Sequence, residues 1–453
     1  MKIWLKILTA VLLLAAVTWL IYRVAQRPAP QASGPIVLPD GSWMHIEAVT
    51  YGTNHLVGPP LSHVAGRLPQ PVRNLMTRYL GRRAAMRFSA TTSSPKLVLW
   101  LNRGVSAAPF PASMGYLECV LSDTNGFASG GEIPFEARYP LTVTEFAAVP
   151  RRAPEITLSI YFHDSTGAVF KRGSVTFANP VYRRYPEWKP EPLPATKRAG
   201  DVEMTLEKLC TGLAPNYEYK PLEGGGHEIV FGTNRLDGGN DTLCALRLRP
   251  LTNTNEVWHV TQVITSDATG NKVSSTALGS SEDSFFTYSP ALWPGETWKL
   301  NCELKRTAGF KPEEQFTFRD VPLGALNATN RVGWTTNCSG VTVTLEHIVR
   351  RAPPTNQHNG SSSEGSQVRL TTSGLTNDWH LDLLSARTDH GTNLHSGSWS
   401  SSDTNRTIHF REIPTNATTS DFTFAVQRSR WVEFLAKPET GTARLEVAPR
   451  SKP

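Results

Sequence analysis

Residues 203–209 read EMTLEKL, residues 342–348 read TVTLEHI, and residues 44–49 read MHIEAV. In each stretch apolar and polar side chains alternate, which is the pattern of a β-strand with one buried face. The same acidic residue recurs at equivalent places: Glu47, Glu207 and Glu346. Three identical active sites in one chain would be unusual, so we interpret these glutamates as structural. Repetition at such a long interval predicts three related β modules.

Two further segments repeat in the same order. A middle strand begins at Gly115 (GYLECVLSDTNG), at Val257 (VWHVTQVITSDATG) and at Asp378 (DWHLDLLSARTDHG), and each ends in a turn with Asp and Gly. Such turns are typical of β-hairpins. A pair of strands then closes each module, in residues 155–180, 296–322 and 421–438. We predict that each of these pairs forms a hairpin.

The composition fits this repeated β pattern. The chain has 453 residues, of which 39% are hydrophobic, 9% aromatic and 19% charged, with 34 Gly and 33 Pro. These values exclude a disordered, collagen-like or coiled-coil chain and favour a turn-rich β protein. We place module 1 at residues 37–190, module 2 at residues 200–322 and module 3 at residues 331–449, and each length suits one domain.

Modules with about seven short alternating strands resemble immunoglobulin-like and fibronectin III-like domains. The resemblance implies an all-β fold of three tandem antiparallel sandwiches. In module 2, the order Cys244, Trp258, Cys302 is similar to the immunoglobulin Cys, Trp, Cys spacing. That similarity implies a disulfide between Cys244 and Cys302, and the alternative is two small buried side chains. No spacing of Cys and His matches a zinc site, so we predict no metal and no cofactor.

The N-terminal 27 residues suggest a transmembrane anchor. Residues 3–22 form an apolar run with one charge, Lys6, and Arg23 and Arg27 follow it. A run of about 20 apolar residues can span a bilayer as a helix, and a cleaved signal peptide is the alternative. A Pro-rich spacer follows at residues 28–36. We predict a single-pass membrane protein with an exported body.

A basic helix is expected inside module 1. Residues 71–88 read PVRNLMTRYLGRRAAMRF, with Pro at a helix start and apolar residues at helical intervals. Five arginines lie within this expected helix: Arg73, Arg78, Arg82, Arg83 and Arg87. Residues 48–117 contain no Asp or Glu. The helix can therefore bind anionic membrane headgroups, and the alternative is a helix that caps the sandwich with its arginines in water.

Two tryptophans are candidates for stacking on sugar rings, because a flat apolar face with a polar edge suits a sugar. Trp293, in ALWPGE, and Trp399, in HSGSWSSS, both lie in turn-like contexts. Trp258 and Trp379 occupy equivalent strand positions and are expected in the cores. We therefore expect Trp293 and Trp399 to be the more exposed tryptophans, open to a glycan ligand.

The chain contains no HExxH, GxSxG or P-loop motif, and no GxGxxG after a strand. At the level of architecture it resembles membrane-anchored bacterial proteins with immunoglobulin-like repeats, which implies a non-enzymatic role in binding a protein or glycan, or in spacing. The alternative is an envelope hydrolase or glycan-processing enzyme with a site between modules. Buried carboxylates or histidines clustered between modules would favour the enzyme. Nucleic-acid binding is disfavoured, because it would require a cytoplasmic body.

Overall fold

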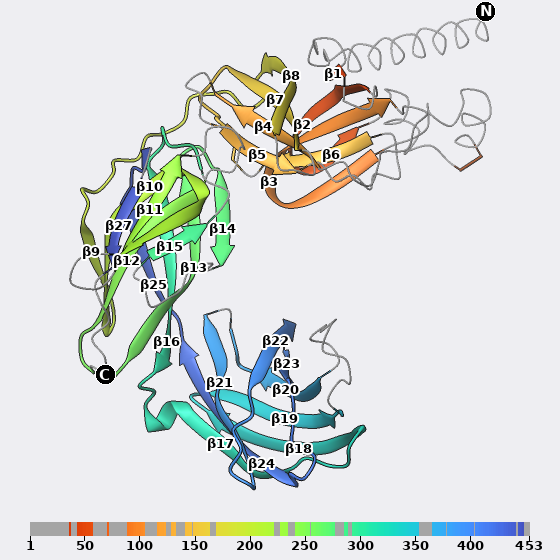
Figure 1. Ribbon diagram of the computed structural model, residues 1–453, viewed down its shortest axis with the longest axis vertical. Coiled ribbons are helices and arrows are strands. Elements are labelled where there is room, and N and C mark those ends of the chain that lie inside the picture. The colour runs from red at the N-terminus through yellow and green to blue at the C-terminus, as the bar shows by residue number, and fades with distance from the viewer. Residues whose placement is uncertain are drawn as a thin grey trace, which may run out of the picture.

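In a computed structural model of the chain, the described residues form an all-β fold with several mostly antiparallel sheets (Figure 1). Buried side chains gather into three separate cores, which define modules 1, 2 and 3 along the chain. The structure describes residues 36–37, 43–57, 70–71, 88–104, 116–123, 128–132, 141–146, 148–163, 169–221, 227–233, 241–253, 255–276, 285–288, 292–352, 365–376, 378–402, 404–440 and 443–447.

The expected membrane anchor is the first correction. Among the residues that the structure describes, no helix is long and apolar enough to cross a membrane. The single-pass membrane localisation expected from the sequence is therefore not supported by the described residues. The segment on which that prediction was based, residues 1–27, lies outside the described residues. Of the spacer at residues 28–36, only Ile36 is described, in strand β1 (Ile36–Val37).

Module 1 consists of two four-stranded sheets that pack around one core. The first has the order β1, β2 (Trp43–Val57), β3 (Phe88–Gly104), β6 (Leu141–Phe146). The second has the order β5 (Ala128–Glu132), β4 (Tyr116–Ser122), β7 (Glu155–His163), β8 (Val169–Ala178). Leu99 and Phe146 from the first sheet share the core with Leu158 from the second, and all three are fully buried. β7 and β8 form the predicted hairpin.

Module 2 also has two sheets around one core. In the first, β9 (Ala195–Ala199), β10 (Val202–Pro221), β12 (Asp241–Pro250) and β15 (Phe285–Tyr288) lie side by side, and β11 (His227–Thr233), β26 (Glu439–Thr440) and β27 (Ala443–Val447) extend it. The second has the order β14 (Lys272–Thr276), β13 (Val257–Asp267), β16 (Trp298–Ala308), β25 (Arg430–Ala436). The last of these strands comes from the far end of the chain.

Module 3 has a five-stranded and a three-stranded sheet. The larger has the order β18 (Ala328–Cys338), β19 (Val341–Arg350), β20 (Ser366–Ser373), β23 (Asn405–Phe410), β22 (Ser396–Ser402). The smaller has the order β17 (Gln315–Pro322), β24 (Thr419–Arg428), β21 (Trp379–Thr388). A short 3-10 helix, η1 (Pro312–Glu314), precedes β17.

Modules 2 and 3 exchange their last strands, so two of the three predicted hairpins do not form. β17 follows β16 in the chain but pairs with β24 in module 3, and β25 follows β24 but pairs with β16 in module 2. Each module therefore takes its closing strand from the other. In Figure 1 the blue strands β25 and β27 lie among the green strands of module 2. Module 3 is consequently an insertion within module 2.

Two different crossings carry the chain between these modules. Ser429 alone separates β24 from β25, so the two strands run almost as one. In the other direction Gly309, directly after β16, has a φ of 77°, and a Cβ there would lie 2.7 Å from the carbonyl oxygen of Asn255. Only glycine adopts that conformation and fits that space without strain, so this crossing depends on it.

The three recurring glutamates have a shared backbone role. The register with the next strand shifts between Ile46 and Ala48, between Leu206 and Lys208, and between Leu345 and His347. Glu47, Glu207 and Glu346 therefore each occupy a β-bulge. This shared position agrees with their interpretation as structural residues and explains why the opening strands resemble one another.

The expected disulfide does not form. Cys244 in β12 and Cys302 in β16 are both free and fully buried in the core of module 2, beside Trp258. Burial raises the pKa of the Cys302 thiol to about 12, so it stays protonated and behaves as a small apolar side chain. The alternative of two small buried side chains therefore describes this pair.

Candidate functional site

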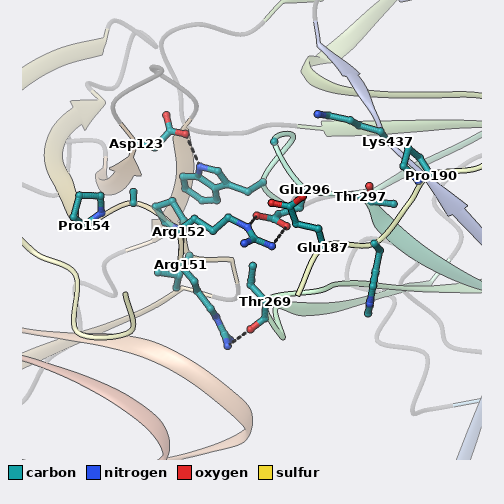
Figure 2. Close-up of a pocket in the computed structure, with 16 residues that line it drawn as sticks. Asp123, Arg151, Arg152, Pro154, Glu187, Pro190, Thr269, Glu296, Thr297 and Lys437 are labelled. Atoms are coloured by element: carbon teal, nitrogen blue, oxygen red, sulfur yellow. Dashed lines mark hydrogen bonds and ion pairs between the residues drawn. The ribbon is translucent and has the colours of Figure 1, made fainter. Parts of the chain in front are cut away.

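A pocket of about 620 Å³ lies where module 1 meets module 2 (Figure 2). One wall is the segment of residues 149–154, which leads from β6 into β7. The other wall comes from module 2 and from residues 187–190 of the linker. Because residues of both modules and the linker line it, the geometry of the joint determines the shape of the pocket.

A single asparagine joins the two modules through backbone groups. The Oδ1 of Asn271 accepts a hydrogen bond from the Val149 amide at 3.2 Å, and its Nδ2 donates to the Val149 carbonyl oxygen at 2.9 Å. All these groups are buried. Asn271 thus pairs with Val149 much as a neighbouring strand would, and fixes the position of module 1 on the turn between β13 and β14.

Arg151 completes this joint from the module 1 side. Its guanidinium donates to the carbonyl oxygens of Thr269 at 2.7 Å and Gly270 at 3.1 Å, and to Asn271 Oδ1 at 3.1 Å. Gly270 has a φ of 94°, and a Cβ there would lie 3.1 Å from Arg151 Nη1. The Asp and Gly turn predicted from sequence is therefore the contact surface for module 1.

The turn itself is held rigid by Asp267. Its Oδ1 accepts hydrogen bonds from the Thr269 amide at 2.9 Å and hydroxyl at 2.7 Å, and from the Asn271 amide at 3.1 Å. Its Oδ2 accepts from Asn271 Nδ2 at 2.8 Å. A buried carboxylate with this many donors is well satisfied, so the surface that Arg151 contacts is formed in advance.

Arg152 ties the linker to module 2 at the pocket edge. It donates to both carboxylate oxygens of Glu296, from Nε at 2.5 Å and from Nη2 at 3.2 Å. It also donates to the carbonyl oxygens of Tyr185 at 3.0 Å and Pro186 at 2.6 Å. The hydrogen bond to Glu296 raises the pKa of Arg152. A bidentate pair of arginine and carboxylate also fixes the relative orientation of the two side chains.

Trp293 lies in the pocket wall, but not as the exposed residue that the sequence suggested. It is only 5% exposed and belongs to the core of module 2. Its Nε1 donates to Asp123 Oδ2 in module 1 at 2.8 Å. The flanking prolines and glycine gave a turn-like context, but the indole folds inward and joins the two modules. The expected open face of Trp293 is therefore a wrong prediction.

The other predicted site residues are not brought to this pocket. Trp399 lies in strand β22 and not in a turn, and its side chain is outside the described part of the structure. Gln70 and Pro71 have helical backbone and Phe88 begins strand β3, whereas residues 72–87 of the expected basic helix lie outside the described residues. That holds for its five arginines: Arg73, Arg78, Arg82, Arg83 and Arg87.

The half-exposed aromatic residue of the pocket is Trp188, which sequence reasoning passed over. Lys299 lies over its ring, with Nζ at 5.2 Å from the ring centre. Trp188 belongs to the stretch PEWKPEP, which we interpreted only as a linker between modules. An aromatic residue surrounded by prolines and charges in a linker was the signal that could have identified it.

A second polar cluster lies at the joint between modules 2 and 3. Glu303 of β16 accepts hydrogen bonds from Ser429 Oγ at 2.5 Å and from Thr261 Oγ1 at 2.9 Å. His380 of β21 places its Nε2 2.9 Å from Glu303 Oε1 and 2.6 Å from Ser429 Oγ. Glu303 and Ser429 are buried, so this cluster connects the crossing between β24 and β25 to strands of both modules.

Serine, histidine and glutamate are the residue types of a hydrolase triad, but their arrangement differs. In a triad one ring nitrogen of His contacts the nucleophile and the other contacts the acid. Here the same nitrogen of His380 contacts both Ser429 and Glu303, and Ser429 also donates directly to the carboxylate. A neighbouring pocket of about 240 Å³ is not lined by any of the three. The arrangement suits a structural cluster, formed by Glu303, His380 and Ser429, that holds modules 2 and 3 together.

We expect low pH to weaken this structural cluster, because Glu303 becomes protonated. Burial alone would raise the pKa of Glu303, but hydrogen bonds from His380, Ser429 and Thr261 outweigh it and lower the pKa to about 2. A carboxyl with a lowered pKa stabilises the fold above its unfolded pKa, roughly 4.3, and loses that contribution as the pH falls towards 2. At neutral pH the contribution is roughly 3 kcal/mol.

Urea unfolding of wild type and Glu303→Gln at several pH values checks this expectation. The difference in free energy of unfolding should be largest near neutral pH and should shrink steadily below about pH 4.3. Glu433→Gln is the matched control, because Glu433 on β25 is exposed and forms an ion pair with Lys299. A Glu303→Gln difference that stays constant over this pH range would contradict the assignment.

Comparisons with known proteins add little to these observations. No family model and no curated protein matches the chain. Among solved structures, one match is described as the tetra-tandem repeat in the extending region of a large adhesion protein. It is 9% identical and covers 90% of this chain and 76% of that chain, with a TM-score of 0.13. A likeness at this level supports no conclusion about fold or function.

Proposed function

We propose that this protein is a non-enzymatic structural and binding protein, in which three immunoglobulin-like sandwiches are held in fixed relative positions. The observation that carries the proposal is the reciprocal exchange of β17 and β25 between modules 2 and 3. Two covalent crossings hold these modules more tightly than one flexible linker would. Such a body suits a spacer that presents a site at a set position.

The repeated strand order supports the sandwich assignment. The first sheets follow the orders β1-β2-β3-β6, β9-β10-β12-β15 and β18-β19-β20-β23, with the opening strand second in each. The second sheets place the middle strand beside β7, β16 or β24 in the same way. Two antiparallel sheets around a shared core are the plan of immunoglobulin-like domains.

The joints support a binding role over catalysis. In the pocket between modules 1 and 2, the functional groups of Arg151, Arg152 and Glu296 are all committed to hydrogen bonds that hold the joint. In the joint between modules 2 and 3, the carboxylate of Glu303 is equally committed. Groups engaged in this way position modules and are poorly placed to transfer protons.

Distances between spin labels test the rigidity of both joints. All five native cysteines are buried, so labels attach at introduced cysteines. Thr176→Cys with Thr196→Cys reports on modules 1 and 2, and Thr196→Cys with Thr335→Cys reports on modules 2 and 3; all three positions are exposed. We expect a single narrow distance distribution for each pair, measured by pulsed electron paramagnetic resonance.

The variant Arg151→Ala, Asn271→Ala should broaden only the first distribution, because it removes the hydrogen bonds between modules 1 and 2. The second pair of labels serves as its internal control. Broad distributions for both pairs in the unaltered joints would contradict the rigid-spacer proposal.

A further inference from the structure

We propose that the pocket between modules 1 and 2 binds a neutral oligosaccharide, with the indole of Trp188 as the platform for a sugar ring. The proposal concerns what the pocket recognises and does not depend on the rigidity of the modules. The volume of the pocket, about 620 Å³, lies within the range of roughly 300–1,000 Å³ found for small-ligand sites.

Trp188 is fixed in place on both sides along the chain. Before it, the carbonyl oxygens of Tyr185 and Pro186 accept hydrogen bonds from Arg152. After it, the Glu191 amide donates to the Leu435 carbonyl oxygen of β25 at 2.7 Å. Lys299 lies over the ring and is not among the residues that line the pocket. The indole therefore presents its pocket side to a ligand at little entropic cost.

Two charged residues at the pocket edge are available to a ligand. Glu187 and Lys437 both line the pocket and are exposed. Neither makes a hydrogen bond or an ion pair with another residue in the described ranges, whereas Arg152 and Glu296 are paired with each other. A carboxylate accepts and an ammonium donates, and sugar hydroxyls can do both, so the two together suit a polyhydroxylated ligand.

The charges of the pocket favour a neutral ligand. The acidic lining residues are Asp123, Glu187 and Glu296, and the basic lining residues are Arg151, Arg152 and Lys437. These charges balance, so neither an anion nor a cation gains net attraction.

A proline-rich peptide is the other ligand that aromatic residues commonly bind, and it needs a groove lined by several open rings. In this pocket the indole of Trp293 is closed, because it is buried and bonded to Asp123. Trp188 is then the open indole among the lining residues. One flat platform with polar groups at its edge fits a sugar ring better than a polyproline helix.

Isothermal titration of the full chain with cellotetraose, chitotetraose and maltotetraose tests the proposal. We expect saturable binding of at least one of the three. Trp188→Ala should weaken that binding tenfold or more, and Glu187→Gln, an exposed substitution that leaves the fold intact, should weaken it severalfold. Trp334→Ala is the matched control, because Trp334 is 39% exposed on β18 of module 3, and it should bind as wild type does.

Failure of all three sugars to bind, or equal binding by wild type and Trp188→Ala, would overturn the proposal. A peptide with the sequence of spacer residues 28–35, PAPQASGP, is titrated in parallel. Saturable binding of this peptide and of none of the sugars would assign the pocket to proline-rich segments instead. The spin-label distances are independent of these titrations, so failure here leaves the rigid-spacer proposal separately testable.

Discussion

Replacing Phe434 with alanine is expected to destabilise module 2 by about 3–5 kcal/mol and to leave module 3 close to its normal stability. Phe434 follows all of module 3 in the sequence. It nevertheless lies on β25, 1% exposed, in the core of module 2 and opposite Leu300 of β16. Removing its ring leaves a cavity among packed side chains, and that is the physical reason for the large loss.

Hydrogen exchange followed by mass spectrometry locates the effect. In Phe434→Ala, amides of β13 and β16 should exchange faster, and those of β19 and β20 should not. Phe422→Ala is the reciprocal control, because Phe422 on β24 is fully buried in the core of module 3. Faster exchange in β19 and β20 of Phe434→Ala would contradict the strand exchange.

Replacing Arg306 with methionine is expected to cost about 3–5 kcal/mol of unfolding free energy. Arg306 of β16 donates to Glu256 at 2.9 Å and also pairs with Glu314 of η1, and its side chain and that of Glu256 are almost wholly buried. Its backbone groups bond the side chain of Gln427 on β24. Without the guanidinium, the carboxylate of Glu256 stays buried with no countercharge.

A double substitution separates this charge effect from packing. Arg306→Met with Glu256→Gln should be clearly more stable than Arg306→Met alone in urea unfolding, because the buried unpaired carboxylate of Glu256 is removed. It should not fully recover wild-type stability, because the hydrogen bond that Trp258 Nε1 donates to Glu256 Oε2 at 3.0 Å would go to a neutral acceptor and the ring contact with Arg306 is lost. Arg198→Ala, at an exposed arginine of β9, is the control and should change stability little. A double variant no more stable than the single one would contradict this account.

Local patterns predicted the individual strands well. The opening strand of residues 342–348 lies within β19, and the middle strand that begins at Val257 is β13. Alternation of apolar and polar residues is a property of neighbouring positions, so it can be recognised without knowing the fold. The recurrence of a glutamate at the position of Glu207 also has a local cause. It lies in a β-bulge, and a bulge at a fixed place in a strand recurs wherever that strand is repeated.

The strand exchange was missed although one signal for it is present. Module 1 has DSTG at residues 164–167 between its last two strands, which is a hairpin turn sequence. The corresponding stretch of module 3, QRSRW at residues 427–431, contains no Gly, Pro, Asn or Asp. A pair of strands without a turn residue between them is better interpreted as one strand that continues into another sheet. Repetition across the modules favoured a hairpin and outweighed that local evidence.

The candidate site could not have been predicted from spacing. Arg151 and Asn271 bond each other although they lie 120 positions apart, and Trp293 bonds Asp123 across 170 positions. A joint between modules depends on how two finished surfaces meet, and no periodicity along the chain encodes that. For the same reason Trp293 could not be recognised as buried, because the residue that accepts its N–H belongs to another module.

The insertion of module 3 within module 2 also determines how the protein carries tension. The chain enters module 2 at β9, and its last described strand, β27, pairs with β11 of the same module. A pull applied on either side of the described strands therefore passes through modules 1 and 2 and bypasses module 3. The pulling force reaches module 3 only after β25 has separated from β16, along the pairs from Ala436 to Arg430. Module 3 therefore adds to the extended length of the chain only when the force is high enough to separate these two strands.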